Sequence, residues 1–124
     1  MKVLIVDDSK PIRRLLAEML TDVPDISLVQ AESGEDALQK IHGCGAFDLM
    51  LVDWNMPGMD GPTFVRTVRT DPLHQSAKIL MVTTHNAMED VQRAIECGSD
   101  DFLMKPITER EMLHDKLRLL GLMG

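Results

Sequence analysis

The sequence of 124 residues has few cysteines, no long apolar run and no excess of basic charge. Its two cysteines, Cys44 and Cys97, form no Cys-x-x-Cys pair and are too far apart for a metal clip, so we expect free thiols in a reducing compartment. Its apolar runs are too short to cross a bilayer, and Met1 leads into a strand-like run and not a charged-then-apolar leader. These absences predict a cytoplasmic protein that does not insert into membranes.

The charge balance and length narrow the class of protein further. Formal net charge is −7, and an acidic domain repels a phosphate backbone, which argues against direct nucleic-acid binding. Hydrophobic residues make up 44% of the chain, which favours a buried core over intrinsic disorder. The length is typical of one domain, and no linker, repeat or low-complexity stretch divides it. We therefore expect a single domain over residues 1–124.

Short apolar runs alternate with segments of helical periodicity. Five runs predict β-strands: Lys2–Val6, Ile26–Ala31, Phe47–Val52, Lys78–Val82 and Asp101–Met104. The first, a continuous β-branched run, suits a strand that is buried on both faces. Five helices are predicted, over Ile12–Leu20, around Ala37–Ile41, around Phe64–Val68, from about Ala87 to Cys97 and from about Thr108 to Leu120. Ser9 is the predicted N-cap of the first helix, and Thr108 of the last, with Glu111 three residues on. The alternation predicts an α/β fold, with a doubly wound parallel sheet covered by helices on both faces.

Polar side chains follow four of the predicted strands at their carboxyl ends. Asp7 and Asp8 follow the first strand, Asp53 the third, Thr83 the fourth and Lys105 the fifth. Because ligands of open parallel sheets bind at this edge, we expect the five side chains to converge. Three crowded carboxylates repel one another, and a hard divalent cation with oxygen ligands relieves that repulsion. The pattern therefore predicts a Mg²⁺ site.

The same residues suit phosphoryl transfer, which depends mainly on positioning and charge neutralisation. Asp53, central and just before a loop, is the best candidate to accept a phosphoryl group as an acyl phosphate. Lys105 can neutralise one phosphoryl oxygen, and Thr83 can donate a hydrogen bond to another. Taken singly, each has a more ordinary role: Asp7 and Asp8 as charges at a helix N-terminus, Asp53 as a turn cap, Thr83 as a strand-end hydroxyl and Lys105 as a solvated lysine. Their coincidence at one edge favours the phosphoryl-transfer hypothesis.

The sequence resembles the receiver domains of two-component response regulators, in particular the stand-alone, CheY-like type. The matching segments span the chain: Val3–Ser9, Ala31–Leu38, Leu51–Gly61, Met81–Thr84 and Gly98–Pro106. The resemblance implies a flavodoxin-like, five-stranded parallel sheet in the order 2-1-3-4-5 with five helices. It also implies that a histidine kinase donates the phosphoryl group to Asp53 in a Mg²⁺-dependent reaction. On this basis the protein catalyses only its own phosphorylation and dephosphorylation and is otherwise not an enzyme.

The resemblance implies a metal set around the phosphorylation site. Asp8 and Asp53 would bind Mg²⁺ directly, together with the backbone carbonyl of Asn55, and Asp7 would act largely through water. Trp54, next to Asp53, should report metal binding by fluorescence quenching.

The resemblance also implies a switch. Lys105 would contact the phosphoryl group, Thr83 would move toward it, and Phe102 would swing into the vacated space. Phe102 has no hydroxyl, so its burial needs no hydrogen-bond partner, although a plain core role is an alternative. Thr84 would narrow access to the site. The surface of the fourth helix, fifth strand and fifth helix would then change its preferred partner.

Two further residues flank the route of a hydrolytic water. Asn55 and His85 resemble positions that set the lifetime of the acyl phosphate, and a pair of solvated loop residues is the alternative interpretation.

The expected partners are proteins. They are the histidine kinase, a downstream target such as a flagellar switch or another phosphotransfer protein, and, as a further candidate, a phosphatase. A chemotaxis or motility regulator is favoured, with a phosphorelay shuttle or a receiver cut from a longer regulator as alternatives. We expect either a monomer or a weak dimer that forms on phosphorylation.

Three other classes share part of the pattern. An interaction module that no longer takes phosphate conflicts with the complete set of pocket residues. A Mg²⁺-dependent phosphatase with an aspartyl intermediate would need an acid two residues after Asp53, where Asn55 stands, and room for a capping domain. A flavodoxin-type carrier would need a phosphate cradle after the first strand, where Asp7 and Asp8 would repel a flavin phosphate.

Overall fold

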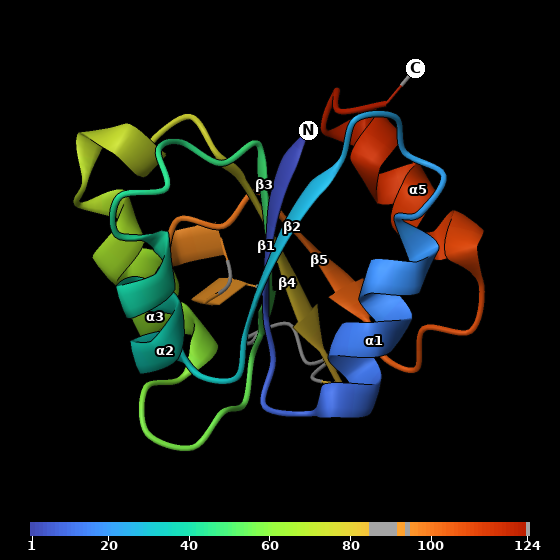
Figure 1. Ribbon diagram of the computed structural model, residues 1–124. Coiled ribbons are helices and arrows are strands. Elements are labelled where there is room, and N and C mark those ends of the chain that lie inside the picture. The colour runs from blue at the N-terminus through green and yellow to red at the C-terminus, as the bar shows by residue number, and fades with distance from the viewer. Residues whose placement is uncertain (85–91, 94, 124) are drawn as a thin grey trace.

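The computed structural model describes residues 1–84, 92–93 and 95–123, and a central parallel sheet organises them (Figure 1). The strand order is β2-β1-β3-β4-β5, with every pairing parallel. The strands are β1 (Lys2–Val6), β2 (Ser27–Ala31), β3 (Leu49–Asp53), β4 (Lys78–Thr83) and β5 (Asp101–Met104). The predicted fold class and strand order are confirmed.

Helices cover both faces of the sheet, as Figure 1 shows. One face carries α1 (Lys10–Met19) and α5 (Arg110–Leu119), and the other carries α2 (Gly34–Ile41) and α3 (Gly61–Arg69). A short 3₁₀ helix, η1 (Pro72–His74), precedes β4. These are the four α-helices whose bounds the described part of the chain defines. The predicted helix over Ala87–Cys97 lies mostly outside the described residues, of which Gln92, Arg93, Ile95 and Glu96 are helical.

The N-termini of the first and last helices, α1 and α5, differ in how they are capped. The hydroxyl of Ser9 accepts a hydrogen bond from the backbone N–H of Ile12 at 3.4 Å. Ser9 is therefore the N-cap of α1, which confirms the prediction. The predicted cap Thr108 is wrong, because α5 begins one residue later with Glu109 as N-cap and no side-chain cap hydrogen bond. The Thr108 hydroxyl instead donates to the sulfur of Met112 at 3.7 Å. The backbone of Glu109 is extended, and Ile107, two residues earlier, is buried in the core.

Strand boundaries also differ slightly from the prediction. Phe47 is buried but lies outside β3, and β3 extends through Asp53. Apolar character alone does not distinguish Phe47 from a strand residue, because its side chain packs in the core while its backbone is not part of the ladder. The correction matters because it makes Asp53 the last residue of a fully buried strand.

Alternate side chains of the strands enter two separate cores. In β1, Val3 and Ile5 pack under α1 and α5, whereas Leu4 and Val6 pack under α2 and α3. Burial on both faces explains why β1, β3 and β4 read as continuous apolar runs, whereas Ser27 and Gln30 of the edge strand β2 are exposed.

Arg69, at the end of α3, forms hydrogen bonds with two loops, one before β4 and one before β5. Its Nη1 donates to the carbonyl oxygens of His74 and Ala77, each at 2.8 Å. Its Nε donates to the carbonyl oxygen of Gly98 at 2.9 Å, and its Nη2 lies 3.0 Å from Oδ2 of Asp100. The guanidinium thus joins the segment before β4 to the segment before β5.

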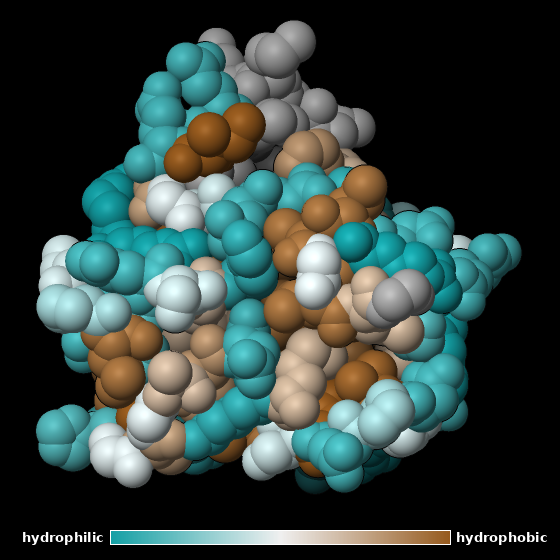
Figure 2. Space-filling view, turned by 90° about the horizontal axis from the view of Figure 1, so that it is seen from above, coloured by the Kyte–Doolittle hydropathy of each residue, from teal (hydrophilic) through white to brown (hydrophobic). Residues whose placement is uncertain are grey.

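The surface shows where the chain leaves apolar groups exposed. Figure 2 views the edge at which the strands begin, where hydrophobic side chains emerge between hydrophilic ones. The exposed large hydrophobic residues of the described chain are Leu73, Ile95 and Leu119.

No helix in the described ranges is both long and apolar enough to cross a membrane. Neither Cys44 nor Cys97 forms a disulfide in the described part of the chain.

Candidate functional site

Three carboxylates meet at the edge where the strands end, the lower edge in Figure 1. Asp7 directly follows β1, Asp8 comes next, and Asp53 ends the adjacent strand β3. One oxygen from each carboxylate lies within 4.8 Å of the others. Asp7 is 1% exposed and Asp53 6% exposed, whereas Asp8 is open to solvent. The group is thus an all-oxygen cluster, buried on one side, that could hold a metal ion.

Lys105 brings a positive charge to this cluster from the end of β5. Its Nζ lies 3.1 Å from Oδ1 of Asp53 and 3.5 Å from Oδ2 of Asp7. Its backbone N–H donates to the carbonyl oxygen of Thr83 at 2.8 Å, and the following bond to Pro106 is cis. One ammonium against three carboxylates leaves the cluster negatively charged.

The charge of the cluster changes the acidity of Asp53. Burial, together with the negative charge of Asp7, raises the pKa of the Asp53 carboxyl to about 6, and the ammonium of Lys105 only partly opposes this. The ionised form of Asp53 is therefore disfavoured, and a cation in the cluster would restore it.

Backbone contacts fix Asp7 in place. Its Oδ1 accepts from the N–H of Ser9 at 2.8 Å, and its own N–H donates to the carbonyl oxygen of Ala31 at 3.1 Å. Nη1 of Arg13 donates to the carbonyl oxygen of Asp7 at 2.5 Å. Sequence reasoning missed Arg13, although its position one turn into the first helix would have placed it near the end of β1.

The loop from Trp54 to Asp60 is also held at several points. The N–H of Trp54 donates to the carbonyl oxygen of Val82 at 3.1 Å. Oε1 of Glu35, on α2, accepts from the N–H of Met59 at 3.1 Å. Glu35 was not among the predicted site residues, since no spacing in the sequence links it to this loop. The loop is thus positioned from both β4 and α2.

Close backbone packing explains the glycine at the start of α3. A Cβ on Gly61 would lie 2.4 Å from the carbonyl oxygen of Asp53 and 3.0 Å from Cα of Trp54. Asp60 caps the same helix, and its Oδ1 accepts from the N–H of Thr63 at 2.9 Å. The helix can therefore begin directly against the end of β3 only if residue 61 has no side chain.

The other predicted site residues are spread around the cluster. Thr83 is the buried last residue of β4, and Thr84 follows it in an exposed position. Asn55 is exposed in the loop after β3. Phe102 is half-buried in β5 and packs against the core under α2 and α3. His85 lies outside the described residues.

A lysine on α5 contacts the Phe102 ring. Nζ of Lys116 lies 5.2 Å from the ring centroid and 3.2 Å from both carboxylate oxygens of Asp101. The cation thus joins β5 to α5 directly beside Phe102.

This geometry is that of a phosphorelay signalling domain, and comparison with known proteins identifies the family. The response regulator receiver domain model matches residues 3–118, so the chain belongs to that family. It is a signalling protein and not an enzyme of the ordinary kind. A CheY-like receiver domain implies a histidine kinase as phosphodonor and a downstream target.

Individual relatives match nearly the whole chain. The chain is 36% identical over 117 residues to the chemotaxis protein CheY of Pseudomonas aeruginosa, covering 94% of this chain and 93% of that protein. It is similar to the structure of the chemotaxis protein CheY4 of Vibrio cholerae, with a TM-score of 0.86, 36% identity and coverage of 95% and 96%. It also matches half of a probable two-component system response regulator/GGDEF domain protein, with a TM-score of 0.85, 29% identity and 98% of this chain covered. The predicted CheY-like receiver domain is confirmed by the first two.

Proposed function

We propose that Asp53 accepts a phosphoryl group from a histidine kinase, and that the acyl phosphate changes which proteins bind this domain. Residues 1–124 act as one receiver domain in the cytoplasm. The observation that carries the proposal is the meeting of three carboxylates and Lys105 at one sheet edge.

On the acceptor side, the transfer step uses two residues that are already in contact, Asp53 and Lys105. A carboxylate oxygen of Asp53 attacks phosphorus and forms a P–O bond, while the P–N bond to the donor imidazole breaks. The departing imidazole nitrogen keeps the electron pair and then takes a proton. Lys105, 3.1 Å from Asp53, can follow the negative charge from the carboxylate onto the phosphoryl oxygens. The domain thus catalyses its own phosphorylation.

The oxygen donors fit Mg²⁺. Asp8, Asp53 and the backbone carbonyl of Asn55 would hold it directly. Asp7 would act through water, since its Oδ1 already accepts from the N–H of Ser9. When bound, the ion supplies neutralisation of charge on the phosphoryl oxygens.

Thr83 and Phe102 would carry the signal away from the site. The Thr83 hydroxyl would hydrogen-bond a phosphoryl oxygen and vacate space, and Phe102 would move inward from its half-buried position. A Phe ring can enter the core without a hydrogen-bond partner, which lowers the cost of the inward state. The surface that includes β5 and α5 would then present a different shape to its target.

Asn55, Thr84 and His85 would set the lifetime of the acyl phosphate. Asn55 and Thr84 are both exposed after strands that end at the cluster, where a hydrolytic water would approach. The proposed role of His85 depends on its sequence position alone.

Phosphorylation is tested with acetyl phosphate as a small-molecule donor. We expect the wild type to incorporate phosphate in the presence of Mg²⁺, as followed by intact-protein mass. Asp53→Asn should incorporate none, and Asp60→Asn, which changes a carboxylate in the same loop, should behave as wild type. Labelling of Asp53→Asn at the wild-type level would show that another residue is the acceptor.

The metal site is tested by fluorescence of Trp54, the only tryptophan, which is buried next to Asp53. Mg²⁺ should quench the wild type in a saturable manner. An Asp8→Ala variant that titrates like the wild type would contradict the assigned ligands.

The proposed pathway is chemotaxis or motility, because the similar proteins of P. aeruginosa and V. cholerae are chemotaxis proteins. The match to half of a response regulator/GGDEF protein supports the alternative of a receiver from a longer regulator. A pull-down with and without beryllofluoride, a mimic of the phosphoryl group, distinguishes them. Capture of a flagellar switch component only with beryllofluoride supports the motility proposal, and capture of other phosphotransfer proteins alone argues against it.

A further inference from the structure

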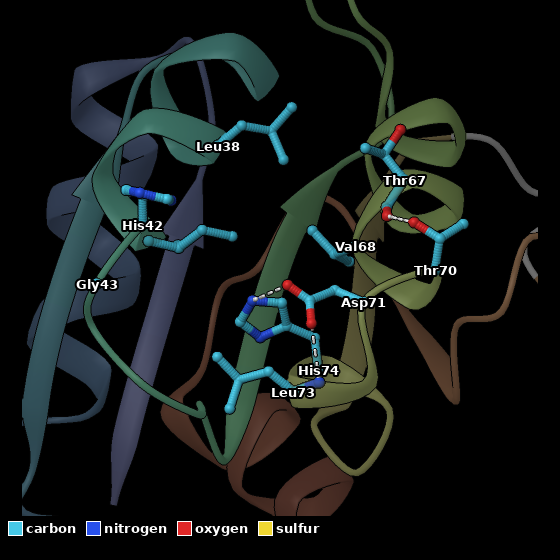
Figure 3. Close-up of a pocket in the computed structure, with 10 residues that line it drawn as sticks. Leu38, His42, Gly43, Thr67, Val68, Thr70, Asp71, Leu73 and His74 are labelled. Atoms are coloured by element: carbon cyan, nitrogen blue, oxygen red, sulfur yellow. Dashed lines mark hydrogen bonds and ion pairs between the residues drawn. The ribbon is translucent and has the colours of Figure 1, made fainter.

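A cavity lies away from the acidic cluster, at the ends of α2 and α3 and beside η1 (Figure 3). Its volume is about 460 Å³, which is within the range of small-molecule sites. Its apolar wall consists of Leu38, Ile41, Val68 and Leu73. Leu73 is 46% exposed at this position, so an apolar ligand would cover a side chain that is now in water.

The polar wall contains a buried imidazole. His74 is 3% exposed, and its Nδ1 has no hydrogen-bond partner among the residues that the structure describes. Figure 3 shows the ring projecting from η1 toward the side chains of α2 across the cavity. This nitrogen is itself buried, so a ligand in the cavity would bond it once the imidazole ring turns, and that bond would remove the cost of a buried polar atom without a partner.

The neighbouring carboxylate indicates which kind of polar group fits. Oδ2 of Asp71 lies 4.0 Å from Nε2 of His74, which favours the proton on Nε2 and leaves Nδ1 as an acceptor. Oδ1 of Asp71 accepts from the N–H of Leu73 at 3.0 Å, which fixes the carboxylate at the cavity.

Two hydroxyls add further acceptors. Thr67 donates its hydroxyl proton to the carbonyl oxygen of Thr63 at 2.8 Å, and Thr70 donates its own to that of Thr67 at 2.6 Å. Each hydroxyl oxygen therefore has only lone pairs left to offer a ligand.

No lysine or arginine is among the described residues that line the cavity. The nearby guanidinium of Arg69 is engaged with the carbonyl oxygens of His74, Gln75 and Ala77. The cavity is thus rich in acceptors, carries the negative charge of Asp71, and has an apolar wall.

We infer that this cavity is a binding site for a small molecule with an apolar body and a primary ammonium group. The three N–H groups of the ammonium donate to the Asp71 carboxylate, to Nδ1 of His74 and to one of the two threonine oxygens. The apolar body lies against the leucine and valine side chains. Neither the phosphoryl chemistry nor the acidic cluster takes part, so the inference is independent of the proposed function.

Phenethylamine, 2-phenylethanol and phenylacetate test it, because they share a ring and differ in the polar group. Each is titrated into ¹⁵N-labelled protein, and backbone amide shifts report the site and the affinity. We expect phenethylamine to shift amides at the ends of α2 and α3 and in η1, with weaker binding of the alcohol and no binding of the carboxylate.

Variants separate a specific site from general charge attraction. Asp71→Asn keeps the acceptor for Leu73 and should weaken phenethylamine binding about tenfold, the size of a charged hydrogen bond. His74→Phe keeps the ring and should weaken it about fivefold. Asp115→Asn, on the opposite face of the sheet, removes the same charge and should leave the affinity unchanged. Equal affinity of wild type and Asp71→Asn, equal binding of amine and alcohol, or shifts centred elsewhere would each overturn the inference.

Discussion

At the scale of single residues, the acidic cluster contains buried carboxylates whose negative charges lower the stability of the folded protein. Asp7 and Asp53 are almost fully buried, and Lys105 is the cation that contacts both. Burial and the charge of Asp7 raise the pKa of Asp53 to about 6, so the folded protein holds a proton there more tightly than the unfolded chain does. The site is therefore poised for a cation.

The raised pKa predicts how stability depends on pH in metal-free buffer. The favourable contribution of protonated Asp53 is complete below about pH 4 and is lost as the pH rises through about 6. The full difference corresponds to at most about 3 kcal/mol, and solvent at the open side of the cluster reduces it to about 1–2 kcal/mol. Asp53→Asn cannot ionise, so it should be more stable than wild type by that amount near neutral pH in EDTA, and by less near pH 4. Urea denaturation at both pH values measures this.

Asp60 provides a control with the opposite sign. Although burial opposes it, hydrogen bonds from Thr63 hold the pKa of Asp60 below its usual range. The favourable contribution of ionised Asp60 is thus lost as the pH falls, and Asp60→Asn should be less stable than wild type near neutral pH. If the free energy of unfolding depended on pH equally in wild type and Asp53→Asn, Asp53 would ionise freely in the metal-free protein, which would contradict the prediction for Asp53.

Gly61 tests how tightly α3 packs against the phosphorylation site. A methyl group there would meet backbone atoms of Asp53 and Trp54, which cannot move aside without shifting the loop. We expect Gly61→Ala to lower the free energy of unfolding by about 2–3 kcal/mol. Gly43→Ala, at φ +81° with open space around it, should cost only about 1 kcal/mol from backbone strain. Denaturant titration compares the two, and equal losses would exclude the close contact as the cause.

At the scale of helices and strands, the sequence predicts what depends on local pattern. All five strands appear because each is an apolar run, and Asp7, Asp8, Asp53 and Lys105 converge because each follows a strand. The contacts of Glu35 and Arg69 could not be predicted, since each joins segments that only the folded chain brings together.

The wrong cap at Thr108 has the same cause. Its spacing from Glu111 fits a capping box, but Ile107 beside it is anchored in the core, and the helix starts only after Glu109, whose backbone is extended. A tertiary requirement overrode a local signal.

The contact between β5 and α5 predicts how the switch is biased. The ammonium of Lys116 over Phe102 stabilises the half-buried ring by about 0.5–1 kcal/mol. Lys116→Met should therefore shift the Phe102 equilibrium about two- to fivefold toward the inward state. In protein labelled with fluorophenylalanine, which has three resonances, the Phe102 signal should move toward its position in Mg²⁺ and beryllofluoride.

Lys2 offers a matched control, because its Nζ lies 5.0 Å from the Phe47 ring centroid, away from the proposed switch. Lys2→Met should change the Phe47 signal and leave that of Phe102 in place. A Phe102 signal that is unchanged in Lys116→Met would show that the cation does not hold the ring.

At the scale of the whole molecule, the sheet separates two cores and concentrates the charge conflict at one of its edges. Each core joins strands to helices on one face, so the strand ends that carry Asp7, Asp8 and Asp53 are held together by most of the buried side chains. Repulsion between the carboxylates therefore lowers the free energy of unfolding of the whole fold. A ligand that removes this repulsion should raise the free energy of unfolding of the entire chain.

Mg²⁺ should accordingly raise the stability of the whole protein. At a hundredfold excess over its dissociation constant, an ion that binds only the folded state adds about 2.7 kcal/mol to the free energy of unfolding. We expect this gain in wild type, measured by urea denaturation at increasing Mg²⁺, and its loss in Asp8→Asn, where a solvent-exposed carboxylate of the cluster becomes neutral. Asp115→Asn, an equal charge change on α5, should keep the full gain. If Mg²⁺ stabilised Asp8→Asn as much as wild type, the ion would act through general screening of the acidic surface, and the cluster would not be its site.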